Sequence, residues 1–255
     1  MKIQDRFRLD GKVAIVTGAS KGIGKAITYA LGQQGAQVVV SSRKQEAVDE
    51  VEKELKKESI EALPLACHMG DMEQIQQLVK ETHKAYGGVD IIVNNAATNP
   101  VFGPVVNTDT AAFDKIMDVN VKGPLELAKM AYPIMKERGG GSVINISSIE
   151  GITPGQGLGL YSISKSAMIA MSKVLAREWG NDHIRVNTIC PGLVRTKFSE
   201  ALISNEKILR GVMAKQALPQ IAEPEDIAGL CLFLAAEASA FCTGAVYTAD
   251  GGYTI

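Results

Sequence analysis

The sequence contains few of the residues that build metal sites and disulfide frameworks. The four cysteines, Cys67, Cys190, Cys231 and Cys242, are far apart and form no C-x-x-C pair, and only three histidines are present. This spacing argues against a metal cluster or a set of disulfides. We therefore expect no metal site, and we expect the protein to work in a reducing compartment, the cytoplasm.

An excess of charge of either sign is also absent. Lys and Arg together number 27, Asp and Glu number 28, and the formal net charge is −1. Proteins that bind nucleic acids by neutralising phosphates usually carry a basic excess. We therefore expect no nucleic-acid partner.

Long apolar runs are missing as well. No stretch approaches the ~20 apolar residues that a membrane helix requires. The first ten residues contain no apolar run typical of a secretory signal, and the last three, Tyr253-Thr254-Ile255, are not a peroxisomal address. We therefore expect no membrane partner.

Short apolar runs are present instead, and they alternate with amphipathic stretches along the 255 residues. Each run is too short for a helix and is mostly β-branched, which is typical of a buried strand. The predicted strands are residues 13–16, 38–40, 62–67, 89–93, 142–146, 186–189 and 245–248. The predicted helices are residues 23–34, 45–57, 72–86, 110–136, 162–179 and 224–236. Asp71 and Asp109 are predicted N-caps, and Pro224 suits a first helical turn.

This alternation predicts a single α/β domain over residues 1–255, with a mainly parallel sheet of seven strands and helices on both faces. The strands are continuously apolar, as expected where both faces of a sheet are buried. Residues 193–220 interrupt the pattern. They form either a substrate lid or a surface insertion without a role, and we favour the lid because ligands of open α/β sheets bind where this segment begins.

A glycine-rich turn follows the first predicted strand and opens directly into a helix. It reads Thr17-Gly18-Ala19-Ser20-Lys21-Gly22-Ile23-Gly24. Gly18 allows a tight turn, and Gly22 and Gly24 allow the backbone to approach a pyrophosphate and the helix to pack near the sheet. The helix N-terminus adds free N–H groups for phosphate. A glycine-rich turn without a ligand is the alternative, and we favour binding because the turn lies between a strand and a helix.

Further motifs occur downstream of this turn. They are Asn94-Asn95-Ala96-Ala97, Asn120 within Asp118-Val119-Asn120-Val121, Ser148, Tyr161-Ser162-Ile163-Ser164-Lys165, and Pro191-Gly192-Leu193-Val194-Arg195-Thr196. Each motif is weak alone, but together and in this order they resemble the short-chain dehydrogenase/reductase family over nearly the whole chain. One departure is Ala97, which stands where the family has glycine.

The resemblance implies a doubly wound, Rossmann-type domain that uses a nicotinamide dinucleotide. The cofactor contacts that it implies are Gly18, Ser20, Lys21, Gly22, Ile23, Gly24, Ser42, Arg43, His68, Met69, Asn95, Ala96, Tyr161, Lys165, Pro191, Gly192, Val194 and Thr196. His68 stands where the family often has an aspartate near the adenine, and a surface histidine is an equal alternative. For Asn94 and Asn95, a structural role in tying strands together is an equal alternative.

The end of the second predicted strand indicates which nucleotide is used. NAD-preferring sites usually carry an acid there to bind the ribose 2′-hydroxyl, whereas this chain reads Ser41-Ser42-Arg43-Lys44. Arg43 can pair with a 2′-phosphate, and Lys21 adds a second cation. We therefore expect NADP(H) rather than NAD(H), which is not excluded. The alternative is that these cations are solvated surface charges.

Tyr161 and Lys165 are four residues apart and so share one face of a predicted helix. A free tyrosine has a pKa of about 10, and a nearby ammonium together with oxidised nicotinamide would lower the pKa. We interpret Tyr161 as the general acid in reduction and the general base in oxidation. A surface Tyr–Lys pair is the alternative.

Two further residues complete the predicted catalytic set. Ser148 can hydrogen-bond the substrate oxygen. Ser147 is its neighbour, and only one of the two should face the site because a strand alternates faces. The resemblance selects Ser148, adds ribose binding by Lys165, and implies that Asn120 holds a water that links Lys165 to solvent.

Three segments should form the substrate wall, namely residues 97–105, residues 150–160 and the lid. Their apolar members are Val101, Phe102, Ile152, Leu158, Leu160, Leu193 and Phe198. These residues favour an apolar small-molecule carbonyl substrate. Residues 41–45, 67–70 and 95–103 resemble the NADPH-dependent carbonyl/retinal reductases of the family, so we expect reduction of an apolar ketone or aldehyde.

Other functions stay open. A 3-oxoacyl-thioester reductase shares every catalytic position, and the lid cations Arg195, Lys197, Lys207 and Arg210 could meet a carrier's phosphates or be solvated. A dinucleotide-binding sensor without turnover is a second alternative, although such proteins usually lose the tyrosine or the lysine. A lyase or epimerase is a third.

The resemblance also implies a homotetramer. The long predicted helices and the C-terminal segment would form its interfaces. Met168, Met171 and Leu175 are consistent with such a face and equally consistent with core packing.

Overall fold

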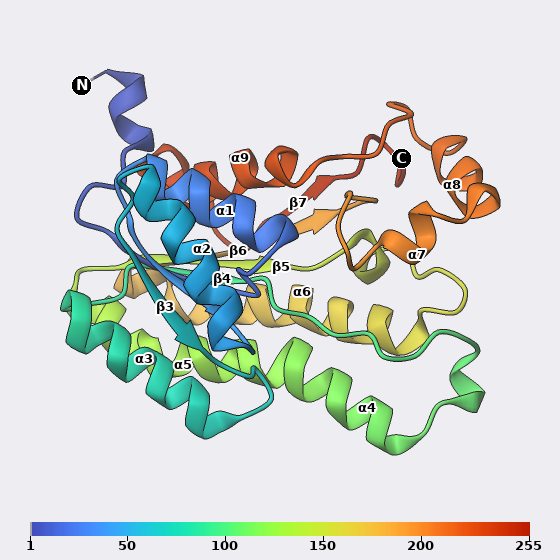
Figure 1. Ribbon diagram of the computed structural model, residues 1–255, viewed down its shortest axis with the longest axis horizontal. Coiled ribbons are helices and arrows are strands. Elements are labelled where there is room, and N and C mark those ends of the chain that lie inside the picture. Colours follow the sequence, from blue (N-terminus) through green and yellow to red (C-terminus); the bar gives the residue numbers. More distant parts are fainter. Residues whose placement is uncertain (1) are drawn as a thin grey trace.

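A single parallel sheet forms the centre of the protein, whose structure is a computed structural model that describes residues 2–255 (Figure 1). The sheet has seven strands in the order β3-β2-β1-β4-β5-β6-β7. The strands are β1 (Val13–Thr17), β2 (Gln37–Ser42), β3 (Ala62–Ala66), β4 (Ile91–Asn94), β5 (Gly141–Ile146), β6 (Ile184–Pro191) and β7 (Val246–Ala249). All six strand pairings are parallel, which confirms the predicted fold class.

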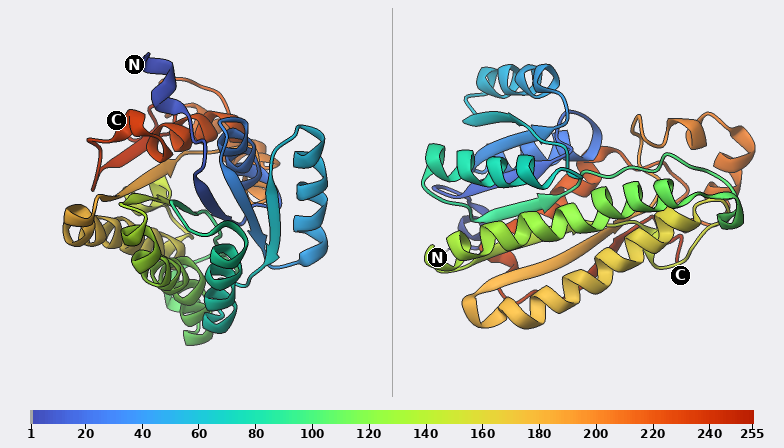
Figure 2. Two further views of the ribbon diagram at one scale, coloured as in Figure 1. Left: turned by 90° about the vertical axis from the view of Figure 1, so that its left-hand side faces the viewer. Right: turned by 90° about the horizontal axis from the view of Figure 1, so that it is seen from below.

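Helices cover both faces of this sheet (Figure 2). On one face, α1 (Gly22–Gln33), α2 (Gln45–Lys57) and α9 (Pro224–Ala235) pack in one apolar cluster. On the other face, α3 (Met72–Tyr86), α5 (Gly123–Glu137) and α6 (Gly159–Trp179) pack in a second cluster. The short helices α4 (Thr110–Met117), α7 (Glu200–Ile203) and α8 (Glu206–Met213) gather at one end of the molecule in Figure 1.

The predicted capping residues are confirmed. The Asp71 side chain accepts from the amides of Glu73 and Gln74, and the Asp109 side chain accepts from the amide of Ala112. Pro224 begins α9. The two aspartates therefore satisfy unpaired amides in the first turns of α3 and α4, and Pro224 has no amide that would stay unpaired at the start of α9.

The helix predicted over residues 110–136 is confirmed, with a change of winding inside it. The structure has α4, a π-helical turn over Asp118–Lys122 (η3) and then α5. Pro124 lacks the amide that would continue the α-helical hydrogen bonding, so the chain changes its winding before that residue. The same turn carries Asn120.

Two of the three α6 residues that suited either a subunit face or the core lie in the core. Met168 and Leu175 are buried, and Met171 packs against the apolar cluster below the sheet. The periodicity of a helix on a large sheet does not distinguish these two environments.

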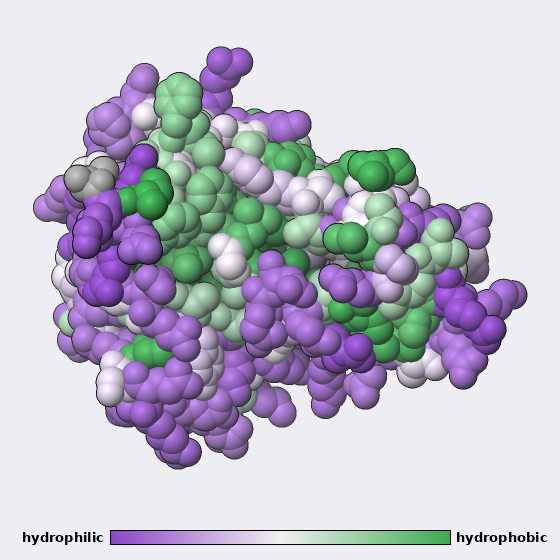
Figure 3. Space-filling model, turned by 90° about the horizontal axis from the view of Figure 1, so that it is seen from above, coloured by the Kyte–Doolittle hydropathy of each residue, from purple (hydrophilic) through white to green (hydrophobic). Residues whose placement is uncertain are grey.

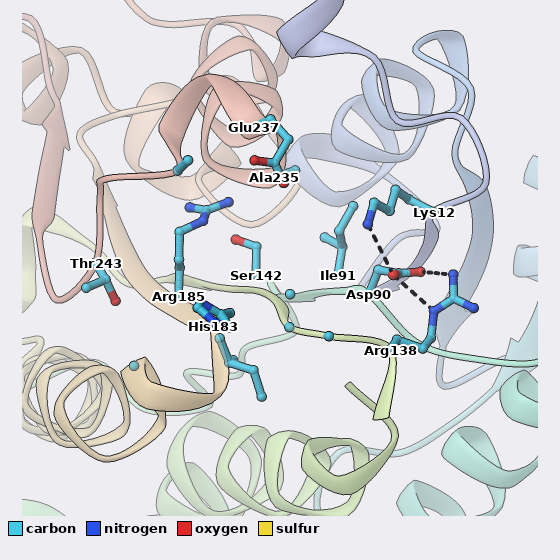
Figure 4. A pocket seen from close by; sticks show the side chains of 16 residues that line it. Lys12, Asp90, Ile91, Arg138, Ser142, His183, Arg185, Ala235, Glu237 and Thr243 are labelled. Atoms are coloured by element: carbon cyan, nitrogen blue, oxygen red, sulfur yellow. Dashed lines mark hydrogen bonds and ion pairs between the residues drawn. The ribbon is translucent and has the colours of Figure 1, made fainter. Parts of the chain in front are cut away.

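Asp90 connects three elements at the amino-terminal edge of the sheet (Figure 4). Its buried carboxylate accepts from the Val13 amide at 2.9 Å and from the Arg138 Nε at 3.0 Å, and the Lys12 Nζ lies 3.5 Å away. A cavity of about 310 Å³ adjoins these residues, at the edge opposite the carboxyl ends of the strands. Because its oxygens are paired, Asp90 stabilises the junction of β1, β4 and α5.

No helix within residues 2–255 combines the length and apolar character needed to cross a membrane. In the same residues, no group of three or more His, Cys, Asp or Glu side chains gathers as a metal site.

Replacing the buried carboxylate should destabilise the fold. We expect Asp90→Ala to lower the free energy of unfolding by about 3 kcal/mol, because the Val13 amide and the Arg138 guanidinium both lose their acceptor. Urea unfolding measures the loss. The matched control is Glu206→Ala, which removes the exposed Glu206–Arg210 pair and should change stability by less than about 0.5 kcal/mol. Equal losses in both variants would contradict this role for Asp90.

Candidate active site

The glycine-rich turn joins β1 to α1 at the carboxyl edge of the sheet. Gly18 and Gly22 have positive φ values of 65° and 55°, which favour glycine. A Cβ on Gly24 would lie 2.4 Å from the Gly18 carbonyl oxygen, and a Cβ on Gly22 would lie 3.0 Å from the Thr196 Cγ2. The turn is therefore compact, and the predicted contact residue Thr196, from beyond β6, lies against it.

The side chain of Asn95 supports this turn by hydrogen bonds. Its Nδ2 donates to the carbonyl oxygens of Thr17 and Gly18 at 2.9 and 3.1 Å. The Thr17 Oγ1 in return accepts from the amides of Asn95 and Ala96, both at 3.1 Å. The side chain of Asn95 therefore ties β4 to the turn, which supports the structural alternative for this residue.

Asn94 has a comparable structural place one residue earlier. Its Nδ2 donates to the Asn145 Oδ1 at 2.8 Å, and the Asn145 Nδ2 donates to the Ser172 Oγ at 2.7 Å. This buried chain of polar groups joins β4, β5 and α6 beneath the site.

The residues of this edge fit a dinucleotide. The first turn of α1 has no side-chain cap on Lys21 within the described residues, in contrast to the capped α3 and α4. Uncapped amides at a glycine-rich helix start suit a pyrophosphate. At the end of β2, Ser42 is half-buried, and Arg43, which follows the strand, is exposed. The buried Ser41 hydroxyl has no hydrogen-bond partner among residues 2–255.

The remaining predicted cofactor contacts lie around the same edge. Ser20 and Ile23 are half-buried in the turn, and Met69 is buried. The His68 Nδ1 accepts from the Gly70 amide at 3.1 Å, which is a local turn contact. Pro191 is the last residue of β6, and Gly192 and Val194 follow it. The Gly192 amide donates to the Ala249 carbonyl oxygen at 2.9 Å.

Tyr161, Lys165 and Ser148 come together at the carboxyl end of β5. Lys165 is 1% exposed and Tyr161 9% exposed. The Lys165 Nζ donates to the Ile146 carbonyl oxygen at 2.8 Å and lies 5.5 Å from the centre of the Tyr161 ring. The nearby Ser148 hydroxyl acts to lower the pKa of Tyr161. The predicted pair therefore lies in the interior beside the predicted serine.

The structure separates the two neighbouring serines. The Ser147 hydroxyl donates to the Lys165 carbonyl oxygen at 2.9 Å and is buried under α6. Ser148 is half-buried, and its Oγ accepts from the Glu150 amide at 3.1 Å. Only Ser148 therefore presents its hydroxyl to Tyr161.

Burial controls the proton affinities of this pair. Desolvation raises the pKa of the Tyr161 phenol, and the charge of Glu150 acts in the same direction. Desolvation also lowers the pKa of Lys165 to about 8. In the protein without cofactor, the pKa of Tyr161 thus moves opposite to the direction expected with oxidised nicotinamide present. The reason is that the phenol is almost wholly removed from water.

Asn120 links the π-helical turn to two neighbouring segments. Its Oδ1 accepts from the Thr98 amide at 2.8 Å, and its Nδ2 donates to the Thr98 carbonyl oxygen and to the Ser164 Oγ, both at 3.0 Å. Ser164 adjoins Lys165 on α6. The amide therefore lies between the β4–α4 loop and the catalytic helix, and the proposed water relay stays a prediction.

The segments predicted as substrate walls meet at this edge. The Gly103 amide donates to the Gly157 carbonyl oxygen at 2.9 Å, and a Cβ on Gly157 would lie 2.9 Å from the Phe102 ring. The ring centres of Tyr161 and Phe198 are 5.9 Å apart. Phe102 and Phe198 are 68% and 57% exposed. Apolar side chains also gather on the surface at the end that carries α7 and α8 (Figure 3).

Two of the four lid cations are already paired with acids. The Arg195 Nε lies 2.8 Å from Glu223, and the Arg210 Nη2 lies 2.9 Å from Glu206. Both pairs are exposed, which is consistent with solvated surface charges.

Several residues that shape the site were not indicated by the sequence patterns. Thr17, Asn145 and Ser164 supply hydrogen bonds to predicted residues, and Glu150 faces Tyr161. Thr17 belongs to the glycine-turn motif, so its position offered a signal. Ser164 lies within the Tyr161–Lys165 motif and Glu150 begins a predicted wall segment, but their contacts, like those of Asn145, join segments that no local pattern brings together.

The chain is similar to known oxidoreductases over nearly its whole length. A family model described as "Enoyl-(Acyl carrier protein) reductase" matches residues 18–254. "Dehydrogenase/reductase SDR family member 4" of Bos taurus is 42% identical over 247 residues, which cover 97% of this chain and 88% of the relative.

Two solved structures have the same fold. A 7α-hydroxysteroid dehydrogenase complexed with NADH and 7-oxo glycochenodeoxycholic acid matches with a TM-score of 0.93 and 31% identity over 99% of this chain and 98% of that one. A gluconate 5-dehydrogenase of Burkholderia cenocepacia in complex with NADP and tartrate matches with a TM-score of 0.95 and 27% identity over 99% of each chain.

The buried ammonium should destabilise the folded protein. We expect Lys165→Met to raise the free energy of unfolding at pH 7 by about 1–3 kcal/mol, because the methionine has no charge to desolvate. The pKa of Lys165 falls to about 8 in the folded state, so the wild type gains stability as pH rises above 8 and the difference between variant and wild type shrinks toward pH 10.

Urea unfolding at both pH values measures this difference. Lys173→Met, at an exposed position on the same helix, is the matched control and should show no pH-dependent gain. A gain for Lys165→Met that grows with pH would contradict the expectation.

Proposed function

This chain belongs to the short-chain dehydrogenase/reductase family, and we propose that it is an NADP(H)-dependent reductase of apolar ketones or aldehydes. Members of this family are NAD(P)-dependent oxidoreductases that act on CH–OH groups. The observation that carries the proposal is the buried Tyr161 hydroxyl beside Ser148, with Lys165 beneath the ring, at the edge that carries the glycine-rich turn.

Tyr161 supplies the proton in the proposed reaction. When bound, the dinucleotide supplies a hydride from its nicotinamide. Tyr161 donates its proton to the carbonyl oxygen, and Ser148 holds that oxygen by a hydrogen bond. Burial raises the pKa of Tyr161, so the phenol is in its acid form at neutral pH, and the nearby Lys165 ammonium is needed to stabilise the phenolate that proton donation leaves.

Lys165 sets the charge at the base of the site. Its ammonium donates to the Ile146 carbonyl oxygen and lies below the Tyr161 ring, where it can stabilise the phenolate that forms as the proton leaves. Its pKa of about 8 means that this charge is lost in mildly alkaline solution.

The exposed aromatic side chains around the site support an apolar substrate. Phe102 and Phe198 offer ring surface on two of the three wall segments. A similar protein is complexed with a 7-oxo steroid, which is a bulky ketone. A carrier-bound acyl thioester, such as a 3-oxoacyl thioester, is the second candidate substrate, because the description of the matching family model names an acyl carrier protein. The pairing of Arg195 and Arg210 with acids weighs against a carrier's phosphates as partners of these residues.

We also propose that the chain assembles as a homotetramer, as the family resemblance implies. Ile163 and Val174 on α6 are 47% and 53% exposed, so this helix has apolar groups on its outer side.

Removing the Tyr161 hydroxyl tests the proposed reaction. We expect the wild type to oxidise NADPH with apolar ketones and aldehydes, and we expect Tyr161→Phe to lower kcat by about 10³-fold, because the acid is lost. The dissociation constant of NADPH should stay within about threefold, since the ring remains. NADPH absorbance and fluorescence give the two measurements.

The same assay separates the alternatives. A higher kcat/KM with 3-oxoacyl thioesters than with any ketone would favour the second candidate. Tight NADPH binding without turnover of any carbonyl compound would favour a sensor. Near-native turnover by Tyr161→Phe would rule out the mechanism.

Arg43 should determine the choice of nucleotide. We expect Arg43→Ala to raise the KM for NADPH by about 10- to 100-fold and to leave the KM for NADH nearly unchanged, because only NADPH carries the 2′-phosphate. Steady-state kinetics with both nucleotides measure this difference. Lys53→Ala, at an exposed position on α2, is the control. An equal loss with both nucleotides would argue against a 2′-phosphate contact.

A further inference from the structure

Glu150 joins three segments beside the predicted catalytic residues. It follows Ser148 by two residues, in a short 3₁₀ turn over Ile149–Gly151 (η4). One carboxylate oxygen, Oε2, accepts from the Gly155 amide at 2.7 Å and from the Ser162 Oγ at 2.9 Å. A single oxygen atom therefore fastens the middle of the β5–α6 loop and the first turn of α6 to the end of β5.

The loop backbone lies directly on this carboxylate. A Cβ on Gly155 would lie 2.8 Å from Oε1 and 3.2 Å from Oε2 of Glu150, so a side chain at position 155 would displace the carboxylate. A charged acceptor that holds two donors in a half-buried place forms stronger hydrogen bonds than a neutral one. The carboxylate is thus a fixed point of a loop that otherwise has no helix or strand between Gly151 and Gly159.

The loop that Glu150 holds also contacts the predicted substrate wall. Two residues after Gly155, the Gly157 carbonyl oxygen accepts from the Gly103 amide, and the Phe102 ring packs where a Gly157 Cβ would be. At the other end of the contact, Ser162 directly follows Tyr161 on α6. Glu150 therefore connects the placement of Phe102 to the placement of the residue that protonates the carbonyl oxygen.

We propose that Glu150 is a positioning residue whose carboxylate holds loop residues 151–158 in place, so that a bulky carbonyl substrate is oriented between Phe102 and Tyr161. This inference rests on the proposed carbonyl reduction and adds a determinant of substrate size. A ketone that fills the space up to the wall depends on the loop position, whereas a small ketone contacts mainly Tyr161 and Ser148. Glu150 itself does not donate a proton or touch the reacting atoms.

Two substitutions separate the hydrogen bonds of Glu150 from its charge. The amide oxygen of Glu150→Gln can accept from both Gly155 and Ser162, because one oxygen accepts both bonds in the structure. Glu150→Ala removes both bonds. Ser162→Ala removes one of them and keeps the anchor on Gly155, which makes it the matched control.

The kinetic test compares a bulky aryl ketone with a small aliphatic ketone. We expect Glu150→Ala to raise the KM for the bulky ketone by about tenfold and to change the KM for the small ketone and for NADPH less than about twofold. Glu150→Gln should restore the KM for the bulky ketone to within about threefold of the wild type, and Ser162→Ala should do the same. An equal rise for both ketones and NADPH in Glu150→Ala would mean a general structural role and would overturn the inference.

Amide hydrogen exchange supplies a readout that needs no turnover. In Glu150→Ala we expect residues 151–158 to exchange about tenfold faster or more, with the wild-type rate retained in Glu150→Gln. Unchanged exchange in Glu150→Ala would overturn the inference even in an active enzyme. A wild type that reduces neither ketone would instead refute the proposed function, and the exchange comparison would still decide whether Glu150 holds the loop.

Discussion

The removal of Tyr161 and Lys165 from water is the constraint on which the site depends. Among residues 2–255, the Lys165 ammonium has one hydrogen-bond acceptor, the Ile146 carbonyl oxygen, and burial lowers the pKa of Lys165 to about 8. The same burial raises the pKa of the Tyr161 phenol. The phenol is therefore protonated and a weak acid by itself, so proton donation to a carbonyl oxygen depends on the nearby ammonium, which stabilises the phenolate.

Close backbone contacts surround the buried pair of Tyr161 and Lys165. Gly151 packs so closely on the Lys165 backbone that a Cβ there would lie 2.8 Å from its carbonyl carbon. The Ser147 hydroxyl donates to the carbonyl oxygen of the same residue, so the Ser148 hydroxyl is the one that lies near Tyr161. The site thus depends on backbone contacts between β5, the following loop and α6 as much as on the reactive side chains.

Local chemistry was sufficient to predict most of the fold. Capping aspartates and short β-branched runs located helices and strands, and α2 and α3 span the predicted residues 45–57 and 72–86. The change of winding within the helix over residues 110–136 was not predicted, because one amphipathic pattern spans α4, the π-helical turn and α5. That turn involves a tertiary contact, since a Cβ on Gly123 would collide with the Met69 carbonyl oxygen.

The sequence by itself determined the order of the strands and helices, the glycine-rich turn and the spacing of Tyr161 and Lys165, because these depend on residues near one another in the chain. Tertiary structure alone decided that Met168 and Leu175 face the core, that Ser147 is held by the Lys165 carbonyl oxygen, and that Asn95 supports the turn. It also decided the contacts of Glu150. The physical reason is that burial and hydrogen-bond partners depend on which distant segments meet at the carboxyl edge of the sheet, and no local pattern encodes those meetings.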